Sequence, residues 1–191
     1  MVVDIGTGDG RAALRRARRE PGCLVIGLDA AAEPLREASR RAARPLRKGG
    51  LANVLYLVGP AEELPGPLSG TAHELIVCLP WGSLLRGVAR PEPAMLRALA
   101  ATLRPAGRLE LLLSLTEVDV AMGLAPLDEA TLSRLAGAYA AVGLVVTDVR
   151  PATLADVDRL SSSWARRLGI ARRRPAWLLG FTRQALAASG P

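Results

Sequence analysis

The chain has 191 residues, which suits one domain able to bury a substantial core. Half of the residues are hydrophobic, yet no apolar run reaches membrane-spanning length and the first residues do not have the pattern of a secretory signal, so we expect a cytoplasmic protein with no membrane partner. The formal net charge of +7 favours an anionic partner, nucleic acid first. Because Lys48 is the only lysine, a general bias toward arginine is the competing explanation of the charge.

Predicted strands and helices alternate from end to end. The strands are expected near 1–5, 23–28, 53–58, 74–79, 108–115, 143–149 and 176–182. The helices are expected near 10–19, 32–44, 92–103, 128–141 and 153–167, with a turn over 104–107. This order predicts an α/β fold, a seven-stranded, mostly parallel sheet with helices on both faces. We expect residues 1–191 to form a single domain.

The first strand leads into a glycine-rich loop, D-I-G-T-G-D-G over residues 4–10, and then into a helix. Glycines permit a tight turn and close approach to a ligand, and the helix start presents free N–H groups. Asp29 follows the next apolar run, at the usual place of a ribose-binding carboxylate. The pattern predicts a nucleotide-cofactor site.

The spacing of the glycines bears on which cofactor binds. A dinucleotide loop has the pattern G-x-G-x-x-G, whereas Gly6, Gly8 and Gly10 follow G-x-G-x-G. Asp4 stands two residues before the first glycine, as in class I S-adenosylmethionine methyltransferases, which this stretch resembles. An acid suits a ligand that carries an ammonium and a sulfonium. S-adenosylmethionine is favoured, and a nicotinamide dinucleotide or a structural glycine turn remain alternatives.

Two later segments are expected at the same edge of the sheet, because loops at the carboxyl ends of strands line the ligand crevice. Residues 59–65 follow the third strand and would bring Ala61 and Glu62 to the adenine of the cofactor, unless they form a solvated turn. Residues 79–87, L-P-W-G-S-L-L-R-G, follow the fourth strand. Amino-methylating enzymes place an acid or amide where Leu79 stands, so this segment suits a nucleophile with a free lone pair, such as a ring nitrogen.

Arginine clusters occur in two places. Five arginines follow Trp164: Arg166, Arg167, Arg172, Arg173 and Arg174. A tryptophan among arginines suits base stacking with guanidinium groups on phosphates. The second set is Arg40, Arg41, Arg44, Arg47 and Lys48. Each set alone is more often a solvated face; together with the net charge they favour RNA contact.

Cys23 and Cys78 lie in apolar runs without a C-x-x-C pair, so we expect buried thiols and no metal site. We assign no role to the single histidine, His73, and expect a site without His, Cys or Lys.

Taken together, the segments resemble the aminoglycoside-resistance 16S rRNA methyltransferases that modify N1 of adenine-1408, the kanamycin–apramycin resistance type. The most specific matches are P-W-G-S-L-L over 80–85 and W-A-R-R-L over 164–168. The resemblance implies S-adenosyl-L-methionine as cofactor, 16S rRNA in the assembled 30S subunit as substrate, and a monomer. It also implies that the target adenine is flipped between two tryptophans.

The resemblance assigns roles residue by residue. Catalysis would rest on Trp81 and Trp164 as stacking plates, with Pro80 beside them. The cofactor would be held by Asp4, Gly6, Gly8, Asp29, Ala61, Glu62, Leu79 and Ser83. RNA would be held by Arg44, Arg47, Lys48, Arg166, Arg167, Arg172, Arg173 and Arg174. No metal is implied.

Two departures from the family stand out. Family members carry a segment before the first strand, often a β-hairpin, whereas here Met1 opens that strand; we expect this extension to be absent. Met122 stands where related sequences can have a basic residue. A catalytically weak or inactive rRNA-binding homologue is therefore the alternative function. A small-molecule methyltransferase is a further hypothesis, against which the arginine clusters argue.

Overall fold

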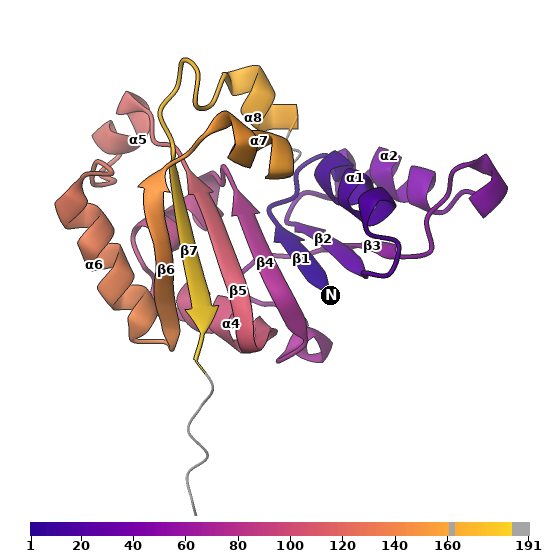
Figure 1. The fold of residues 1–191 in the computed structure, drawn as a ribbon, viewed down its shortest axis with the longest axis horizontal. Coiled ribbons are helices and arrows are strands. Elements are labelled where there is room, and N and C mark those ends of the chain that lie inside the picture. Colours follow the sequence, from indigo (N-terminus) through magenta and orange to yellow (C-terminus); the bar gives the residue numbers. More distant parts are fainter. Residues whose placement is uncertain (161–162, 185–191) are drawn as a thin grey trace, which may run out of the picture.

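A computed structural model describes residues 1–160 and 163–184 (Figure 1). Its seven-stranded sheet has the order β3-β2-β1-β4-β5-β7-β6. The strands are β1 (Val2–Ile5), β2 (Val25–Asp29), β3 (Val54–Val58), β4 (Ala72–Cys78), β5 (Leu103–Leu113), β6 (Leu144–Pro151) and β7 (Trp177–Arg183). Strand β7 runs antiparallel to both of its neighbours, β5 and β6, and the pairs among β1 to β5 are parallel. The expected mostly parallel α/β sheet is confirmed.

Helices cover both faces of the sheet (Figure 1). The α-helices are α1 (Arg11–Arg19), α2 (Ala32–Ala42), α3 (Gly82–Ala89), α4 (Pro93–Thr102), α5 (Glu117–Ala121), α6 (Glu129–Ala140), α7 (Leu154–Leu160) and α8 (Ser163–Leu168). Two short 3₁₀ helices are η1 (Leu46–Lys48) and η2 (Gly66–Leu68). No described helix is long and apolar enough to cross a membrane.

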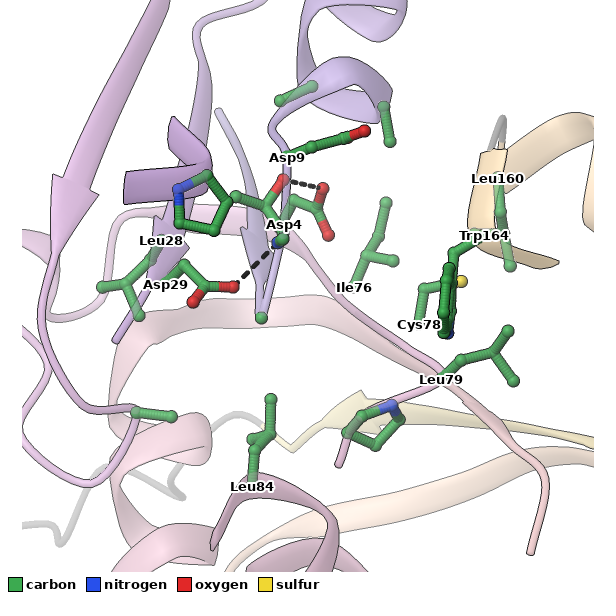
Figure 2. Close-up of a pocket in the computed structure, with 18 of the residues that line it drawn as sticks. Asp4, Asp9, Leu28, Asp29, Ile76, Cys78, Leu79, Leu84, Leu160 and Trp164 are labelled. Atoms are coloured by element: carbon green, nitrogen blue, oxygen red, sulfur yellow. Dashed lines mark hydrogen bonds between the residues drawn. The ribbon is translucent and has the colours of Figure 1, made fainter. Parts of the chain in front are cut away.

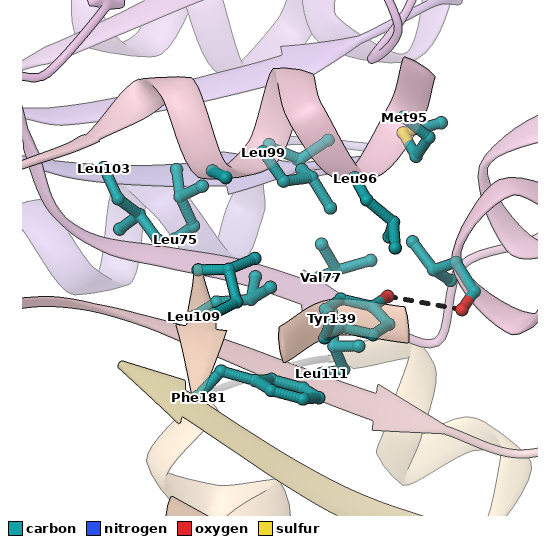
Figure 3. Packing of buried hydrophobic residues seen from close by; sticks show 14 of the residues in the cluster. Leu75, Val77, Met95, Leu96, Leu99, Leu103, Leu109, Leu111, Tyr139 and Phe181 are labelled. Atoms are coloured by element: carbon teal, nitrogen blue, oxygen red, sulfur yellow. Dashed lines mark hydrogen bonds between the residues drawn. The ribbon is translucent and has the colours of Figure 1, made fainter. Parts of the chain in front are cut away.

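Alternating side chains of the central strands fill two separate layers, because successive residues of a strand point to opposite faces. Leu75 and Val77 of β4 join the layer under α4 and α6, whereas Ile76 between them joins the layer under α7 and α8. In the first layer the rings of Tyr139 and Phe181 stack 4.4 Å apart (Figure 3). Burial on both faces explains why these strands are continuous apolar runs.

The structure corrects several expected boundaries. Residues 82–89 form helix α3 rather than a loop, and residues 117–121 form α5, for which no helix was expected. Helix α5 begins with a capping box in which Thr116 and Asp119 bond to each other's backbone N–H. The single helix expected over 153–167 is two helices, and residues 161–162 between them lie outside the described part of the chain.

The turn expected over residues 104–107 lies within β5 instead of before it. Leu103 pairs with Ala72 and Arg108 with Glu74, so residues 104–107 bulge out of the ladder. Ala106 at this bulge has a φ of 60°. The turn residues were therefore recognised, but the strand continues on both sides of them.

Candidate functional site

The glycine-rich loop joins β1 to α1 and is built on positive φ angles. Gly6, Gly8 and Gly10 have φ of 71°, 60° and 68°, a region that L-residues rarely adopt. A Cβ on Gly10 would lie 2.6 Å from the ring of Tyr56, so this glycine is also required for packing. A Cβ on Gly8 would meet no atom within 4 Å. The backbone at Gly8 is therefore open to a ligand.

Asp4 lies at the end of β1 and is buried, with 7% of its surface exposed. The Thr7 hydroxyl donates a hydrogen bond of 2.6 Å to its carboxylate. Burial, helped by the charges of Asp29 and Asp9, raises the pKa of Asp4 to about 6, against the bond from Thr7 and the charge of Arg16. A cationic ligand would stabilise the ionised form of this carboxylate, because the positive charge compensates for the hydration that burial removes.

Asp29 ends β2 and faces the same loop. Its two carboxylate oxygens accept hydrogen bonds from the backbone N–H of Gly8, at 2.8 Å, and of Ala31, at 2.9 Å. Each carboxylate oxygen has a further lone pair, so both remain able to accept from hydroxyl groups. The bonds fix the orientation of the side chain toward the cavity (Figure 2).

These groups line one cavity of about 530 Å³, within the usual size range of small-ligand sites. In Figure 2, Asp4, Asp9 and Asp29 lie on one side of it, and Cys78, Leu79 and Trp164 on the other. The expected site residues that line it are Asp4, Gly6, Gly8, Asp29, Ala61, Leu79, Pro80, Trp81, Trp164 and Arg167. Glu62 directly follows Ala61 and Ser83 directly follows Gly82, but neither of the two lines the cavity.

The segment that follows β4 brings Leu79, Pro80 and Trp81 to the cavity. Leu79 has a φ of 50°, which is unfavourable for a branched side chain, and its N–H donates to the carbonyl of Leu112 at 2.8 Å. Backbone strain of this kind is concentrated at functional sites. Trp81 precedes the first residue of α3 and is 78% exposed. A large aromatic ring in this position has no packing role that accounts for it.

Trp164 reaches the cavity from α8, which lies far from Trp81 in sequence. Its side chain is 43% exposed and lies beside Cys78 and Leu79 in Figure 2. The guanidinium carbon of Arg167 is 5.6 Å from the centroid of the indole, within cation–π range. The fold thus brings both expected stacking residues to one cavity. Trp177, the third tryptophan, is half-buried in β7 and packs on the main cluster instead.

An ion-pair network holds α7, the helix that precedes α8. Buried Asp156 accepts two hydrogen bonds from the Arg150 guanidinium, at 2.7 and 2.8 Å, and two from Thr153. Arg159 bonds to Glu110 of β5. The Arg150 guanidinium and the Thr153 bonds hold the pKa of Asp156 well below its usual range. The network fastens α7 to β5 and β6.

The expected RNA-binding residues lie in two areas. Arg44, Arg47 and Lys48 are exposed around η1, on the projection that follows α2 (Figure 1), and none of them lines the cavity. Arg166, Arg172 and Arg173 are exposed around the end of α8. Arg174 is half-buried and its guanidinium donates to the hydroxyl and carbonyl of Ser114. The structure therefore gives Arg174 a contact that ties this segment to the end of β5.

Sequence reasoning missed several residues of the site. Cys78, expected as a buried thiol, is half-buried and lines the cavity. Thr7 and Asp9 belong to the loop, and the hydroxyl three residues after Asp4 was the available signal for Thr7. Tyr56 supports the loop from β3, through a hydrogen bond of 2.7 Å from its hydroxyl to the Gly10 carbonyl. No local pattern marks that contact. Among the described residues no group of three His, Cys, Asp or Glu side chains could hold a metal.

The cavity suits the cofactor that the loop pattern indicates. S-adenosylmethionine is a cation with a ribose diol, and the cavity offers Asp4 and Asp9 to the cation and Asp29 to the diol. Gly8 leaves room at the loop where a side chain would stand. The three carboxylates and the open backbone at Gly8 therefore both fit S-adenosylmethionine.

Comparisons with known proteins agree with this geometry. The family model described as NpmA, 16S rRNA (adenine(1408)-N(1))-methyltransferase, matches residues 1–182. A 16S rRNA (adenine(1408)-N(1))-methyltransferase of Streptoalloteichus hindustanus is 42% identical over 179 residues, which cover 91% of this chain and 82% of the relative. A mutant of the enzyme with that name from Catenulisporales acidiphilia, solved with cosubstrate SAM, superposes with a TM-score of 0.86 at 36% identity, over 100% of this chain and 87% of that one. The 16S rRNA methyltransferase KamB superposes with a TM-score of 0.84 at 40% identity, over 96% and 87% of the two chains.

Proposed function

The chain belongs to the NpmA family of 16S rRNA (adenine(1408)-N(1))-methyltransferases and depends on S-adenosyl-L-methionine, and from this premise we propose that it methylates N1 of adenine-1408 in 16S rRNA of the assembled 30S subunit. Conferring aminoglycoside resistance is part of the proposal. The observation that carries it is that Trp81 and Trp164, from distant segments, line the cavity that also holds Asp4 and Asp29.

The proposed cofactor contacts follow from where each group lies. Asp4, with Gly6 and Gly8, faces the methionine portion, because a buried carboxylate is the group that gains most from an ammonium. Asp29 accepts from the ribose hydroxyls, and Ala61 borders the adenine. Leu79 lines the cavity, and we propose that it contacts the cofactor there. Glu62 and Ser83 stand just outside the lining, so we propose that they contact only the edge of the cofactor.

Base flipping explains the two exposed tryptophans. Extruding a base from an RNA helix costs a few kcal/mol. Stacking on an aromatic side chain contributes about 1–3 kcal/mol per base, so two rings offset that cost. We propose that Trp81 and Trp164 stack on the two faces of the target adenine, with Pro80 beside it. Arg167, which already lies over the indole of Trp164, strengthens this platform.

The reaction requires from the protein mainly that it position the adenine against the methyl group. The bound cofactor supplies a methyl group on a positively charged sulfur. N1 of adenine carries an available lone pair, so no proton has to be removed before the methyl is accepted. The tryptophans hold the base at the required distance and angle, and Leu79 and Leu84 give the cavity an apolar wall. No general base is assigned to Cys78 or to any carboxylate.

The exposed basic residues are the proposed contacts to the phosphate backbone of 16S rRNA. They are Arg44, Arg47, Lys48, Arg166, Arg167, Arg172 and Arg173, with Arg174 supporting them from its place on Ser114. We propose a monomer as the active form.

A second candidate is an rRNA-binding homologue with weak or no transfer activity. Met122, at the position where the resemblance leads us to expect a basic residue, is 70% exposed on the turn after α5. Calorimetry with S-adenosylmethionine beside a 30S pelleting assay separates the two candidates. Binding of both ligands without methyl transfer favours the second.

Primer extension across nucleotide 1408 tests the proposed reaction, because a methyl on N1 blocks the pairing edge of adenine. Purified 30S subunits treated with the protein and S-adenosylmethionine should give a reverse-transcription stop. The same reaction without cofactor, and with protein-free 16S rRNA, serves as control. Absence of the stop on 30S at saturating cofactor contradicts the proposal. A stop of equal strength on free rRNA contradicts the requirement for the assembled subunit.

A further inference from the structure

Arg90, the residue that follows α3, bonds to the turn at the end of α5. Its Nε and Nη2 atoms both donate to the carbonyl of Gly123, the Nε atom at 3.2 Å. Nη2 also donates a longer bond of 3.4 Å to the carbonyl of Met122. The last carbonyls of a helix have no partner within the helix, and a cation beside them also suits the helix dipole. The guanidinium therefore caps α5 from another part of the fold, across 33 positions of sequence.

The residue at position 123 has to be small for this contact to form. Gly123 has a φ of 91°, and a Cβ on it would lie 2.5 Å from Nη2 of Arg90. Its N–H donates to the carbonyl of Val120 at 2.8 Å, and the N–H of Leu124 donates to the carbonyl of Asp119 at 3.1 Å. A side chain at position 123 would displace the guanidinium, so the turn and Arg90 depend on each other.

Apolar packing reinforces the tie between α3 and the segment around α5. Leu124 is buried in one cluster with Leu85 and Ala89 of α3. Leu115, which precedes α5, packs against the same cluster. Trp81 is the residue just before the first turn of α3. One end of α3 thus carries a proposed stacking residue, and the other end holds the turn of α5.

Helix α5 stands at the edge of the sheet where we propose that rRNA binds. It follows the carboxyl end of β5, which runs parallel to β4, and α8 stands at the same end of the sheet (Figure 1). The hydroxyl of Ser114, three residues before α5, accepts a bond from Arg174, so the arginine segment after α8 adjoins α5. Val118 and Met122 are 65% and 70% exposed. Large apolar side chains exposed beside a proposed interface are suited to contact the partner.

We propose that Arg90 is a positioning residue for rRNA recognition, which holds the α5 turn so that Val118 and Met122 contact the rRNA beside the target nucleotide. The inference rests on the proposed function and adds to it a residue that acts through the turn. A turn that is already held in the free protein loses less conformational entropy when the rRNA binds. Arg90, Met122 and Gly123 do not line the cavity, so the cofactor site is not involved.

The experiment measures steady-state methylation of 30S by the unmodified chain, Arg90→Gln, Gly123→Ala and the double variant. Arg90→Gln removes the guanidinium, whereas Gly123→Ala displaces it and keeps its charge. Each should raise the KM for 30S about three- to tenfold, as expected for the loss of roughly one net hydrogen bond, with kcat kept within about twofold. Because both substitutions break one contact, the double variant should be no weaker than either single variant.

Arg86→Gln is the matched control, because it removes the charge of an exposed arginine from the same helix, one turn before Arg90. Its KM should be that of the unmodified chain. Hydrogen exchange at the amides of Gly123 and Leu124 should become faster in Arg90→Gln and Gly123→Ala and should stay unchanged in Arg86→Gln. By thermal melting all variants should be folded at the assay temperature, and by calorimetry they should keep the Kd for S-adenosylmethionine.

The outcomes that refute the inference are distinct from those that refute the proposed function. A log–log salt slope of 30S binding that falls by about one in Arg90→Gln makes Arg90 a phosphate contact. A lower kcat at unchanged KM shows a general loss of folded enzyme. Effects that multiply in the double variant show two independent contacts. Each of these results, or an unchanged KM in both single variants, refutes the inference while methylation by the unmodified chain upholds the proposed function. If the unmodified chain does not methylate 30S, both fail.

Discussion

The hydroxyl of Thr7 donates a hydrogen bond of 2.6 Å to the carboxylate of Asp4, which is buried where β1 ends. The bond favours the ionised carboxylate, yet burial outweighs it and raises the pKa of Asp4 from 3.8 to about 6. The folded state therefore holds the proton more tightly than the unfolded chain. The associated stability is fully present below pH 3.8 and is lost as the pH rises through about 6.

Asp4→Asn should consequently stabilise the cofactor-free protein at pH 7.5. A shift of roughly two pKa units corresponds to about 3 kcal/mol, and we expect a measured gain in the free energy of unfolding of about 1–3 kcal/mol. Urea unfolding at pH 7.5 and pH 4 checks this, and the difference between variant and unmodified chain should largely vanish at pH 4. Calorimetry should show weaker binding of S-adenosylmethionine. A variant that is less stable at pH 7.5 contradicts the argument.

Tyr56→Phe should weaken cofactor binding by loosening the glycine loop. The substitution removes the hydrogen bond from the Tyr56 hydroxyl to the Gly10 carbonyl but keeps the ring that packs on Gly10. A net hydrogen bond contributes about 1 kcal/mol, so we expect an approximately fivefold higher Kd for S-adenosylmethionine with the maximal rate retained.

Tyr139→Phe is the matched control for this prediction. The Tyr139 hydroxyl donates to the Val88 carbonyl at 3.2 Å within the core, away from the loop. It should lower the melting temperature without changing the Kd of the cofactor. Equal effects of both variants on the Kd would show that the loss is one of general stability.

Trp164→Ala should abolish most methylation of 30S while cofactor binding persists, because the ring lines the cavity without being part of the core. The loss of one stacking plate, about 1–3 kcal/mol, predicts a decrease of about 5- to 150-fold in kcat/KM, and Trp164→Phe should restore much of it. Trp177→Phe, at a tryptophan of β7 that packs on the core cluster, serves as comparison and should retain the rate. If Trp164→Ala does not fold, the result contradicts the prediction and indicates that Trp164 packs the structure.

Asp156→Asn should destabilise the fold, since it leaves the guanidinium of Arg150 without its buried carboxylate. Arg150 is partly exposed, so we expect a loss of about 1–3 kcal/mol in urea unfolding at pH 7.5. Because the pKa of Asp156 is depressed, its contribution is present above the usual carboxyl pKa and is lost on acidification. Asp158→Asn, at an exposed surface pair, should change stability by less than about 0.5 kcal/mol.

Local patterns accounted for the parts of the molecule whose conformation is decided locally. The alternation of apolar runs with amphipathic segments predicted the seven strands and the mostly parallel sheet, and the glycines at 6, 8 and 10 have positive φ angles. Pro93 stands at the first position of α4, as expected of a proline at a helix start. These features depend on neighbours in sequence.

Features set by distant contacts could not be obtained in this way. Tyr56 supports the loop across 46 positions, and Arg174 reaches Ser114 across 60. Helix α3 begins at Gly82, which has a positive φ, and it packs so closely on α4 that a Cβ on Gly87 would lie 2.8 Å from Met95. Cys78 was taken for a core thiol because nothing in its apolar run distinguishes the cavity wall from the interior.

The antiparallel course of β7 has a consequence for how this enzyme class can vary. Since Pro151 pairs with Trp177, and the N–H of Ala152 bonds to the carbonyl of Ala176 at 2.8 Å, the excursion between β6 and β7 leaves and re-enters the sheet at adjacent points. Its length can therefore change with little loop-closure penalty and no shift of strand register. Trp164 and the arginines that follow it belong to this excursion, so relatives can vary the segment that carries them without altering the cofactor loop between β1 and α1.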